Sequence, residues 1–148
     1  MKVARAQLSD VSRAAPLFAA YREFYGEAYE LEASSAFLAS RLARDESVVL
    51  LVTDDTGATV GFTQIYPTFS STRLAPIWLL NDLFVLEDAR GNGAVDALLD
   101  TAATMAVDAG AIAIELATAH DNLRAQAVYA RHGYEVDETF RHYEKPLP

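Results

Sequence analysis

The sequence contains no cysteine and almost no lysine. Without cysteine, a disulfide framework, a thiolate zinc site and a cysteine nucleophile are excluded. Lys2 and Lys145 are the only lysines, and the net charge is −9, from 12 basic and 21 acidic residues. General nucleic-acid binding requires a basic footprint, so we expect no nucleic-acid partner. An acidic surface either assists the approach of a cationic substrate or serves solubility alone.

Long apolar runs are also missing. No segment approaches the roughly 20 apolar residues of a membrane-spanning helix. The N-terminal stretch MKVARAQLSD lacks the apolar core of a signal peptide. We therefore expect a cytoplasmic protein with no membrane partner. The 148 residues are 51% hydrophobic and 22% charged, which fits one domain over residues 1–148 with a core of its own.

The apolar patterning alternates between the periods of strands and helices. The resulting element order is βααβββαβαββ, a mixed α/β fold. It is not a doubly wound nucleotide fold, because too many strands follow one another without a helix between them. We expect strands at 2–8, 47–55, 58–67, 77–85, 111–118 and twice within 134–147, helices at 11–25, 34–44, 93–109 and 122–132, and a loop at 67–76.

The turn Arg90-Gly91-Asn92-Gly93 lies where a buried strand passes into a helix. The first turn of a helix exposes amide N–H groups with no intrahelical partner, and the helix dipole adds positive charge there. Glycines allow a sharp turn close to a phosphate. The turn is therefore either a phosphate site with Arg90 beside it or a plain strand-to-helix connection. It has the spacing of neither a Walker loop nor a dinucleotide fingerprint, so a nucleotide-binding oxidoreductase is disfavoured.

Two motifs together resemble those of the GCN5-related N-acetyltransferases (GNAT). The first five places of the family's [Q/R]-x-x-G-x-[G/A] block are matched by Arg90, Gly91, Asn92, Gly93 and Ala94. The later block N-x-x-A-x-x-x-Y-x-x-x-G-[F/Y] is matched by Asn122, Ala125, Tyr129, Gly133 and Tyr134. The resemblance spans nearly the whole chain.

The resemblance implies a mixed sheet of about six to seven strands flanked by about four helices. It also implies acetyl-CoA as donor, a primary amine as acceptor, no metal and a possible homodimer. Leu80–Val85 is similar to the fourth strand of the diamine and polyamine acetyltransferases, except that Asn81 replaces the glutamate of that branch. Val95 and Asp96 also depart from the motif, and they would crowd or repel bound phosphates.

The family's chemistry assigns roles to these positions. Asp82 is the first candidate for the base that accepts the amine's proton, with Glu115 and Glu27 behind it. Alternatively, Asp82 only holds a cationic substrate or a backbone amide. Tyr129 would protonate the leaving sulfur, and a backbone N–H of Leu83, Phe84 or Val85 would polarise the thioester carbonyl. The remaining cofactor-binding candidates are Arg90, Gly91, Asn92, Gly93, Ala94, Val95, Asp96, Asn122 and Ala125, and the substrate-binding candidates are Tyr25, Glu27, Asn81 and Glu115.

Two further expectations concern these residues. Asn81 and Asp82 are adjacent on a strand, so we expect their side chains on opposite faces. Asn122 either contacts the pantetheine amides of the donor or only caps its helix. A second function, a degenerate domain that binds acyl-CoA without turnover, is kept open by Asn81, Val95 and Asp96.

Overall fold

The computed structural model describes residues 1–148. The chain divides into two compact units, Met1–Ala117 and Thr118–Pro148. The first unit contains strands β1 (Lys2–Arg5), β2 (Val48–Thr53), β3 (Thr59–Ser70), β4 (Ala75–Val85) and β5 (Ile114–Glu115), and helices α1 (Val11–Phe24), α2 (Leu31–Ala43) and α3 (Ala94–Asp108). The second unit contains α4 (Leu123–Arg131). Short 3-10 turns lie at Leu8–Asp10 and Glu87–Ala89.

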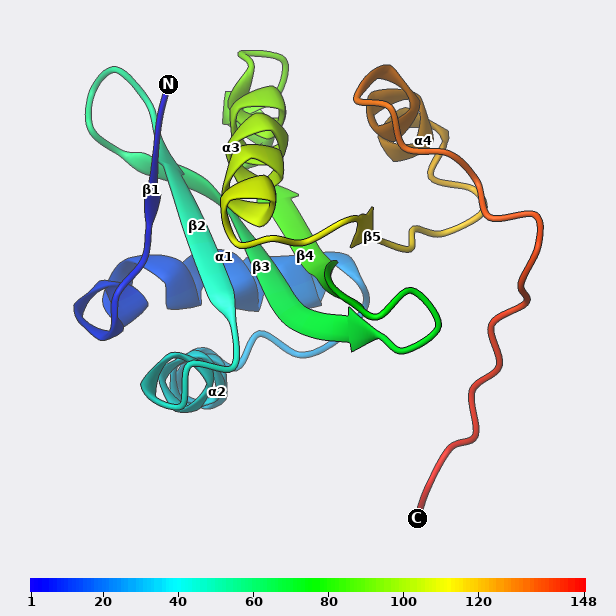
Figure 1. The fold of residues 1–148 in the computed structure, drawn as a ribbon. Helices are drawn as coiled ribbons and strands as arrows, with labels where there is room; N and C mark the ends of the chain where they lie inside the picture. Colours follow the sequence, from blue (N-terminus) through cyan, green and yellow to red (C-terminus); the bar gives the residue numbers. More distant parts are fainter. The chain divides into compact units, whose positions relative to one another are not determined.

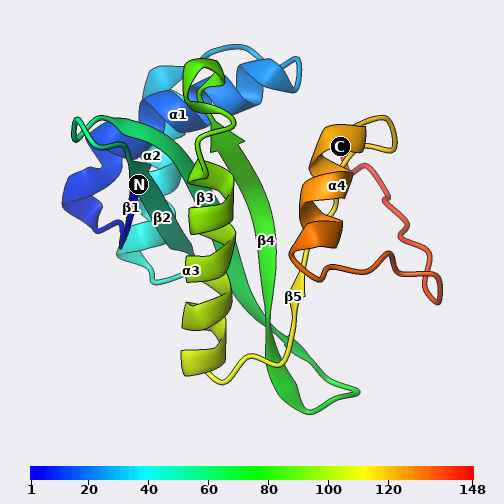
Figure 2. The same ribbon diagram turned by 90° about the horizontal axis from the view of Figure 1, so that it is seen from above.

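The five strands form one sheet in the order β1-β2-β3-β4-β5. All neighbouring strands are antiparallel except β4 and β5, which are parallel. Helices α1 and α2 cover one face of this sheet, and α3 covers the other, as the two views agree (Figures 1 and 2). The first unit is therefore a three-layer structure in which β4 is covered on both faces.

The core follows from the continuous apolar run of β2, all of whose residues from Val48 to Val52 are buried. Such a run is typical of a strand covered on both faces. Val49 and Leu51 join one buried cluster with α1, α2 and β3, which also contains Ala14, Ala15, Leu17, Phe18, Leu38 and Phe62. Because side chains alternate along a strand, Val48, Leu50 and Val52 face α3, which buries Leu98, Leu99, Ala102 and Ala106.

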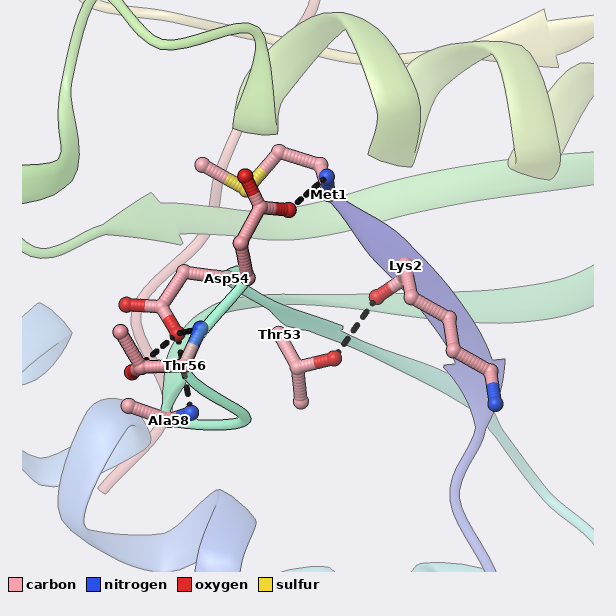
Figure 3. Close-up of polar contacts among 7 residues, drawn as sticks. Met1, Lys2, Thr53, Asp54, Thr56 and Ala58 are labelled. Atoms are coloured by element: carbon pink, nitrogen blue, oxygen red, sulfur yellow. Dashed lines mark hydrogen bonds and ion pairs between the residues drawn. The ribbon is translucent and has the colours of Figure 1, made fainter.

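The hairpin turn between β2 and β3 is held by the side chain of Asp54. One of its oxygens, Oδ1, accepts hydrogen bonds from Thr56 N, Thr56 Oγ1 and Ala58 N (Figure 3). These bonds, the one from the Thr56 hydroxyl first, lower the pKa of the Asp54 carboxyl. In the same region Thr53 Oγ1 donates to the carbonyl of Lys2, which ties β2 to β1.

The predicted loop at 67–76 is wrong, because β3 and β4 remain paired as far as Ser70 and Ala75. Proline suggested a loop, since it cannot donate to a strand ladder. However, β2 begins at Val48, which pairs with Ile65, so the edge of β3 beyond Ile65 has no neighbour on that side. A missing N–H at Pro67 is tolerated on this unpaired edge.

The predicted C-terminal strands are also wrong. The sheet has five strands rather than six or seven, and residues 132–148 contain neither helix nor strand. Within this segment Asp137 Oδ1 accepts hydrogen bonds from the backbone N–H groups of Thr139 and Phe140. This local turn competes with an extended strand. The strand predicted at 111–118 is limited to Ile114–Glu115.

No helix in the structure combines the length and the apolar character that crossing a membrane requires.

Candidate active site

The start of α3 has the backbone geometry that an anion site requires. Gly91 and Gly93 adopt positive φ values of 81° and 82°, and Gly93 is the N-cap residue. The first intrahelical bond of α3 runs from Ala97 N to the carbonyl of Gly93. The amides of the first turn consequently have no intrahelical acceptor. Gly91, Asn92 and Gly93 are exposed, so a phosphate can approach these amides from solvent.

The two residues that depart from the motif lie in this first turn. Val95 and Asp96 are both half-buried, and Ala94 before them is buried. Asp96 is the acidic residue of the first turn, where the helix dipole stabilises a carboxylate. Its charge opposes a bound phosphate at the same helix end.

Arg90 contacts the end of β4 as well as flanking the turn. Its Nε donates to the carbonyl of Val85 at 3.0 Å. The guanidinium carbon lies 5.9 Å from the ring centroids of both Phe24 and Phe84. The positive charge of Arg90 is therefore fixed at the end of β4 rather than extended into solvent.

One edge of β4 is largely unpaired. On the β5 side the strand ladder covers only Trp78 and Leu79, so no neighbouring strand pairs with the edge from Leu80 to Val85 (Figure 2). Leu86 N donates to Val60 of β3, while the Val85 carbonyl faces Arg90. Since backbone groups alternate in direction along a strand, Leu83 and Val85 face the unpaired edge and Phe84 pairs with β3. Of the three predicted backbone contacts, Leu83 and Val85 are thus in position to bind an extended ligand.

A β-bulge lies in the middle of β4. Gln64 of β3 pairs with Asp82, but the next residue, Ile65, pairs with Leu80, so Asn81 is an extra residue. A bulge bends the strand and redirects its side chains. As a result Asn81 Nδ2 donates to Asp82 Oδ1 at 3.2 Å. The expected separation of these two side chains on opposite faces is wrong, because regular alternation does not hold across the bulge.

Asp82 is a buried carboxylate, with only 5% of its surface exposed. Gln64 Nε2 donates to its Oδ2 at 3.0 Å. Burial raises the pKa of Asp82, and the hydrogen bonds from Gln64, Asn81 and Tyr21 oppose this rise. Burial, followed by the nearby charge of Asp82, also raises the pKa of Tyr66 to about 12. Asp82 is consequently a carboxyl whose protonation is tuned by its surroundings, as in general acid–base sites.

An aromatic cluster from α1 lies on this side of the sheet. The ring of Tyr21 lies 5.0 Å from Tyr25, 6.0 Å from Phe62 and 6.4 Å from Phe84, measured between centroids. The hydroxyl of Tyr21 lies 3.4 Å from the carbonyl oxygen of Asn81. Tyr25 is 51% exposed, so it is available to a ligand at the end of α1.

The other predicted substrate contacts have different surroundings. Glu115 of β5 is bound by Arg73, with Nη2 and Oε1 3.2 Å apart, so its charge is already paired. Glu27 is exposed, and its N–H donates to the carbonyl of Arg22.

The second unit contains the later motif. Asn122 caps α4, since its Oδ1 accepts a hydrogen bond from Ala125 N at 3.2 Å. Asn122 and Ala125, the two residues of this unit that were predicted to bind the cofactor, are thus joined by this capping hydrogen bond. The ring of Tyr129 lies 5.7 Å from that of Tyr134, which is half-buried. Within this unit the motif therefore builds the start of α4 and an aromatic pair at its end.

Sequence reasoning missed Tyr21, Gln64 and Tyr66 as neighbours of Asp82. A signal for Gln64 was available, because it is a polar residue within the apolar stretch Val60–Tyr66. A fully buried polar side chain requires a partner, and the partner here is Asp82. Tyr21 gave no such signal, since an aromatic residue at helical spacing is equally typical of a core.

Comparison with known proteins agrees with this geometry. The model of the acetyltransferase (GNAT) family matches residues 14–134. The uncharacterized N-acetyltransferase YhfO of Bacillus subtilis is 46% identical over 148 residues, covering 100% of this chain and 99% of that protein. A probable acetyltransferase of Haemophilus influenzae is 36% identical over 102 residues, or 69% of this chain and 70% of the relative.

The crystal structure of a probable acetyltransferase has a TM-score of 0.94 to this chain at 41% identity, covering 100% of this chain and 99% of the other. The family generally uses acetyl-CoA, and the unpaired edge of β4 and the amides of α3 fit such a donor. With its motifs, sheet and relatives in agreement, the chain belongs to the acetyltransferase (GNAT) family.

Proposed function

We propose that this protein transfers an acetyl group directly from acetyl-CoA to a primary amine of a small molecule, with a diamine or polyamine favoured. The observation that carries the proposal is the buried carboxylate of Asp82 next to Leu83, whose backbone faces the unpaired edge of β4. A proton acceptor and a backbone donor are thus adjacent in the chain. Amine acetylation requires both of these groups.

Donor binding uses backbone groups of the first unit. The pantetheine arm adds to the unpaired edge of β4 as an extra strand, through Leu83 and Val85. The diphosphate binds the first-turn amides of α3, where the helix dipole favours negative charge. Arg90, fixed at the end of β4, contributes its positive charge to the same anion.

The amine arrives as an ammonium, which has no lone pair, because an alkyl ammonium has a pKa of about 10.4. Asp82 accepts one proton from it, directly or through a water. The neutral amine then attacks the thioester carbonyl, and a carbon–nitrogen bond forms. A backbone N–H at the unpaired edge, from Leu83 or Val85, stabilises the negative oxygen of the intermediate.

Collapse of the intermediate breaks the carbon–sulfur bond. In this proposal Tyr129 donates a proton to the leaving thiolate, as the resemblance to the family implies. The nitrogen loses its second proton in this step, which balances the proton given to sulfur. Asp82 returns the first proton to water, and the products are the acetamide and free CoA.

A cationic acceptor is favoured by charge. The chain carries a net charge of −9, and Asp82 lies next to the exposed side chain of Asn81. A polyamine retains a second ammonium group while the first reacts. Negative surface charge assists the approach of such a substrate.

The test is thiol release from acetyl-CoA with a panel of polyamines, amino acids and aminoglycosides, together with calorimetric binding of acetyl-CoA. We expect turnover with at least one diamine or polyamine. The Asp82→Asn variant should be slower by about 100-fold or more, since general base catalysis contributes about 10²–10⁴-fold. Binding of acetyl-CoA without thiol release across the whole panel would instead identify the acyl-CoA sensor.

A further inference from the structure

The two oxygens of the Asp82 carboxylate have different surroundings. Oδ2 accepts a hydrogen bond from Gln64, whose side chain is fully buried. Oδ1 accepts a hydrogen bond from Asn81, whose side chain is exposed. One oxygen is therefore anchored inside the protein, while the partner of the other reaches solvent.

The buried anchor has an unusual feature. Gln64 Oε1 is buried and has no hydrogen-bond partner, although its Nε2 is bonded to Asp82. An unpaired buried acceptor is unfavourable, whereas a bond to a charged acceptor is stronger than a neutral one. The charge of Asp82 thus explains the orientation of the Gln64 amide. The Nε2 group bonds to the carboxylate, and Oε1 is left without a partner.

The exposed partner depends on the bulge. In a regular strand Asn81 would point away from Asp82, and only the extra residue in β4 brings Asn81 Nδ2 to Oδ1. A substrate ammonium is a stronger donor to a carboxylate than a neutral amide. It can therefore replace Asn81 at Oδ1 without disturbing the buried bond at Oδ2.

Other ionisable or charged groups face Asp82 from the elements packed around it. Tyr21 of α1 donates to the charged form of Asp82. Tyr66 of β3, with a pKa of about 12, is neutral in the working pH range. Arg41 of α2 acts on Tyr66 through its charge, and it is paired with Glu46. Because Glu46 is paired with Arg41, Asp82 is the carboxylate among these groups that has no ion-pair partner.

We propose that Gln64 is the positioning residue of the site, holding Oδ2 of Asp82 so that Oδ1 receives the amine's proton, and that Asn81 is the partner which the substrate displaces. This inference rests on the proposed role of Asp82 as base. The proton moves from the ammonium to Oδ1, which leaves a neutral amine and a neutral carboxyl group. No other reactant is required for this step.

The test uses pH profiles of purified full-length variants, measured with saturating acetyl-CoA and the best amine of the panel. The profile of kcat/KM reports the free enzyme, and that of kcat reports the substrate complex. Gln64→Leu should shift the acidic limb of both profiles upward by about one pH unit, since it removes a bond to the charged form. Asn81→Ala should shift only the kcat/KM profile, because substrate has already replaced Asn81 in the complex.

The control is Ser47→Ala, which changes another buried and unpartnered side chain and should move neither profile. If Gln64→Leu does not fold, Gln64→Met removes the same donor with an unbranched chain. Unmoved profiles in a folded Gln64 variant would overturn the anchoring role. Equal shifts of both profiles in Asn81→Ala would overturn displacement.

Failure of the proposed function has a different signature. If no amine is acetylated, or if Asp82→Asn keeps the wild-type profile, the base assignment fails. The anchoring role can still be measured by ¹³C NMR titration of the Asp82 carboxyl. Its midpoint should rise in Gln64→Leu relative to the wild type, and an unchanged midpoint would overturn the anchoring.

Discussion

At the scale of single residues, Asp82 combines a proposed catalytic role with a buried position that is unfavourable for its charge. Burial raises the pKa of its carboxyl above the ordinary value of 3.8. The folded state therefore binds this proton more tightly than the unfolded chain does. Stability from this group is greatest below the unfolded pKa, and it is lost as the pH rises through the folded pKa.

The Asp82→Asn variant should accordingly be more stable than the wild type at neutral pH, because it removes a buried charge. The advantage should disappear below about pH 4, where the aspartate is protonated in both states. Urea unfolding at several pH values measures this difference. If Asp82→Asn instead lowered the free energy of unfolding by the same amount at neutral and at acidic pH, the side chain would act through packing alone.

The hydroxyl of Tyr129 gives a second prediction for a single residue. If its hydroxyl protonates the leaving sulfur, Tyr129→Phe should lower kcat by about 100-fold while the affinity for acetyl-CoA changes little. Tyr134→Phe is the matched control, since it removes the hydroxyl of the ring 5.7 Å away. Steady-state kinetics with calorimetry distinguishes the two variants. Equal losses in both would argue for a packing role of the aromatic pair.

At the scale of elements, the start of α3 requires a left-handed residue. Gly93 has φ +82°, and a Cβ there would meet no atom within 4 Å, so only backbone strain opposes a side chain. Gly110, just after the same helix, has φ +79° and equally open surroundings. The two glycines differ in that Gly93 adjoins the first-turn amides.

Gly93→Ala and Gly110→Ala should therefore each cost about 1–2 kcal/mol of stability. Only Gly93→Ala should also weaken acetyl-CoA binding, by about tenfold, which corresponds to about 1.4 kcal/mol. Thermal unfolding and calorimetry of both variants test this. Unchanged affinity in Gly93→Ala would count against diphosphate binding at this turn.

At the scale of the whole molecule, the net charge of −9 should act on the two proposed substrates in opposite directions. The acidic field attracts a polyamine and repels the anionic acetyl-CoA. Salt screens both effects, since the Debye length falls from about 10 Å at 0.1 M to about 3 Å at 1 M.

Raising the salt concentration over this range should lower kcat/KM for a polyamine by about threefold to tenfold. The value of kcat/KM for acetyl-CoA should be unchanged or higher. Steady-state kinetics with each substrate varied in turn provides the measurement. A neutral-chain monoamine serves as control, because it carries a single charge. Parallel losses for both substrates would indicate a general salt effect on the enzyme.

The sequence by itself determined the order of the elements through β5 and α4, because apolar periodicity and glycine positions are local properties. It also located the turn at 90–93 and the strand that carries Asp82. The predictions from sequence were wrong where strand pairing determines the secondary structure. The tip of the β3–β4 hairpin formed despite Pro67, since the donor that this proline lacks would lie on an edge of β3 without a neighbour.

Only the tertiary structure decided which residues surround the Asp82 carboxylate. The bulge at Asn81 arises from the register between β3 and β4, which local sequence does not encode. That register brings Gln64 to one carboxylate oxygen and Asn81 to the other. Patterns in one strand predict which residues are buried, whereas the partner of a buried charge depends on a strand that is distant in the sequence.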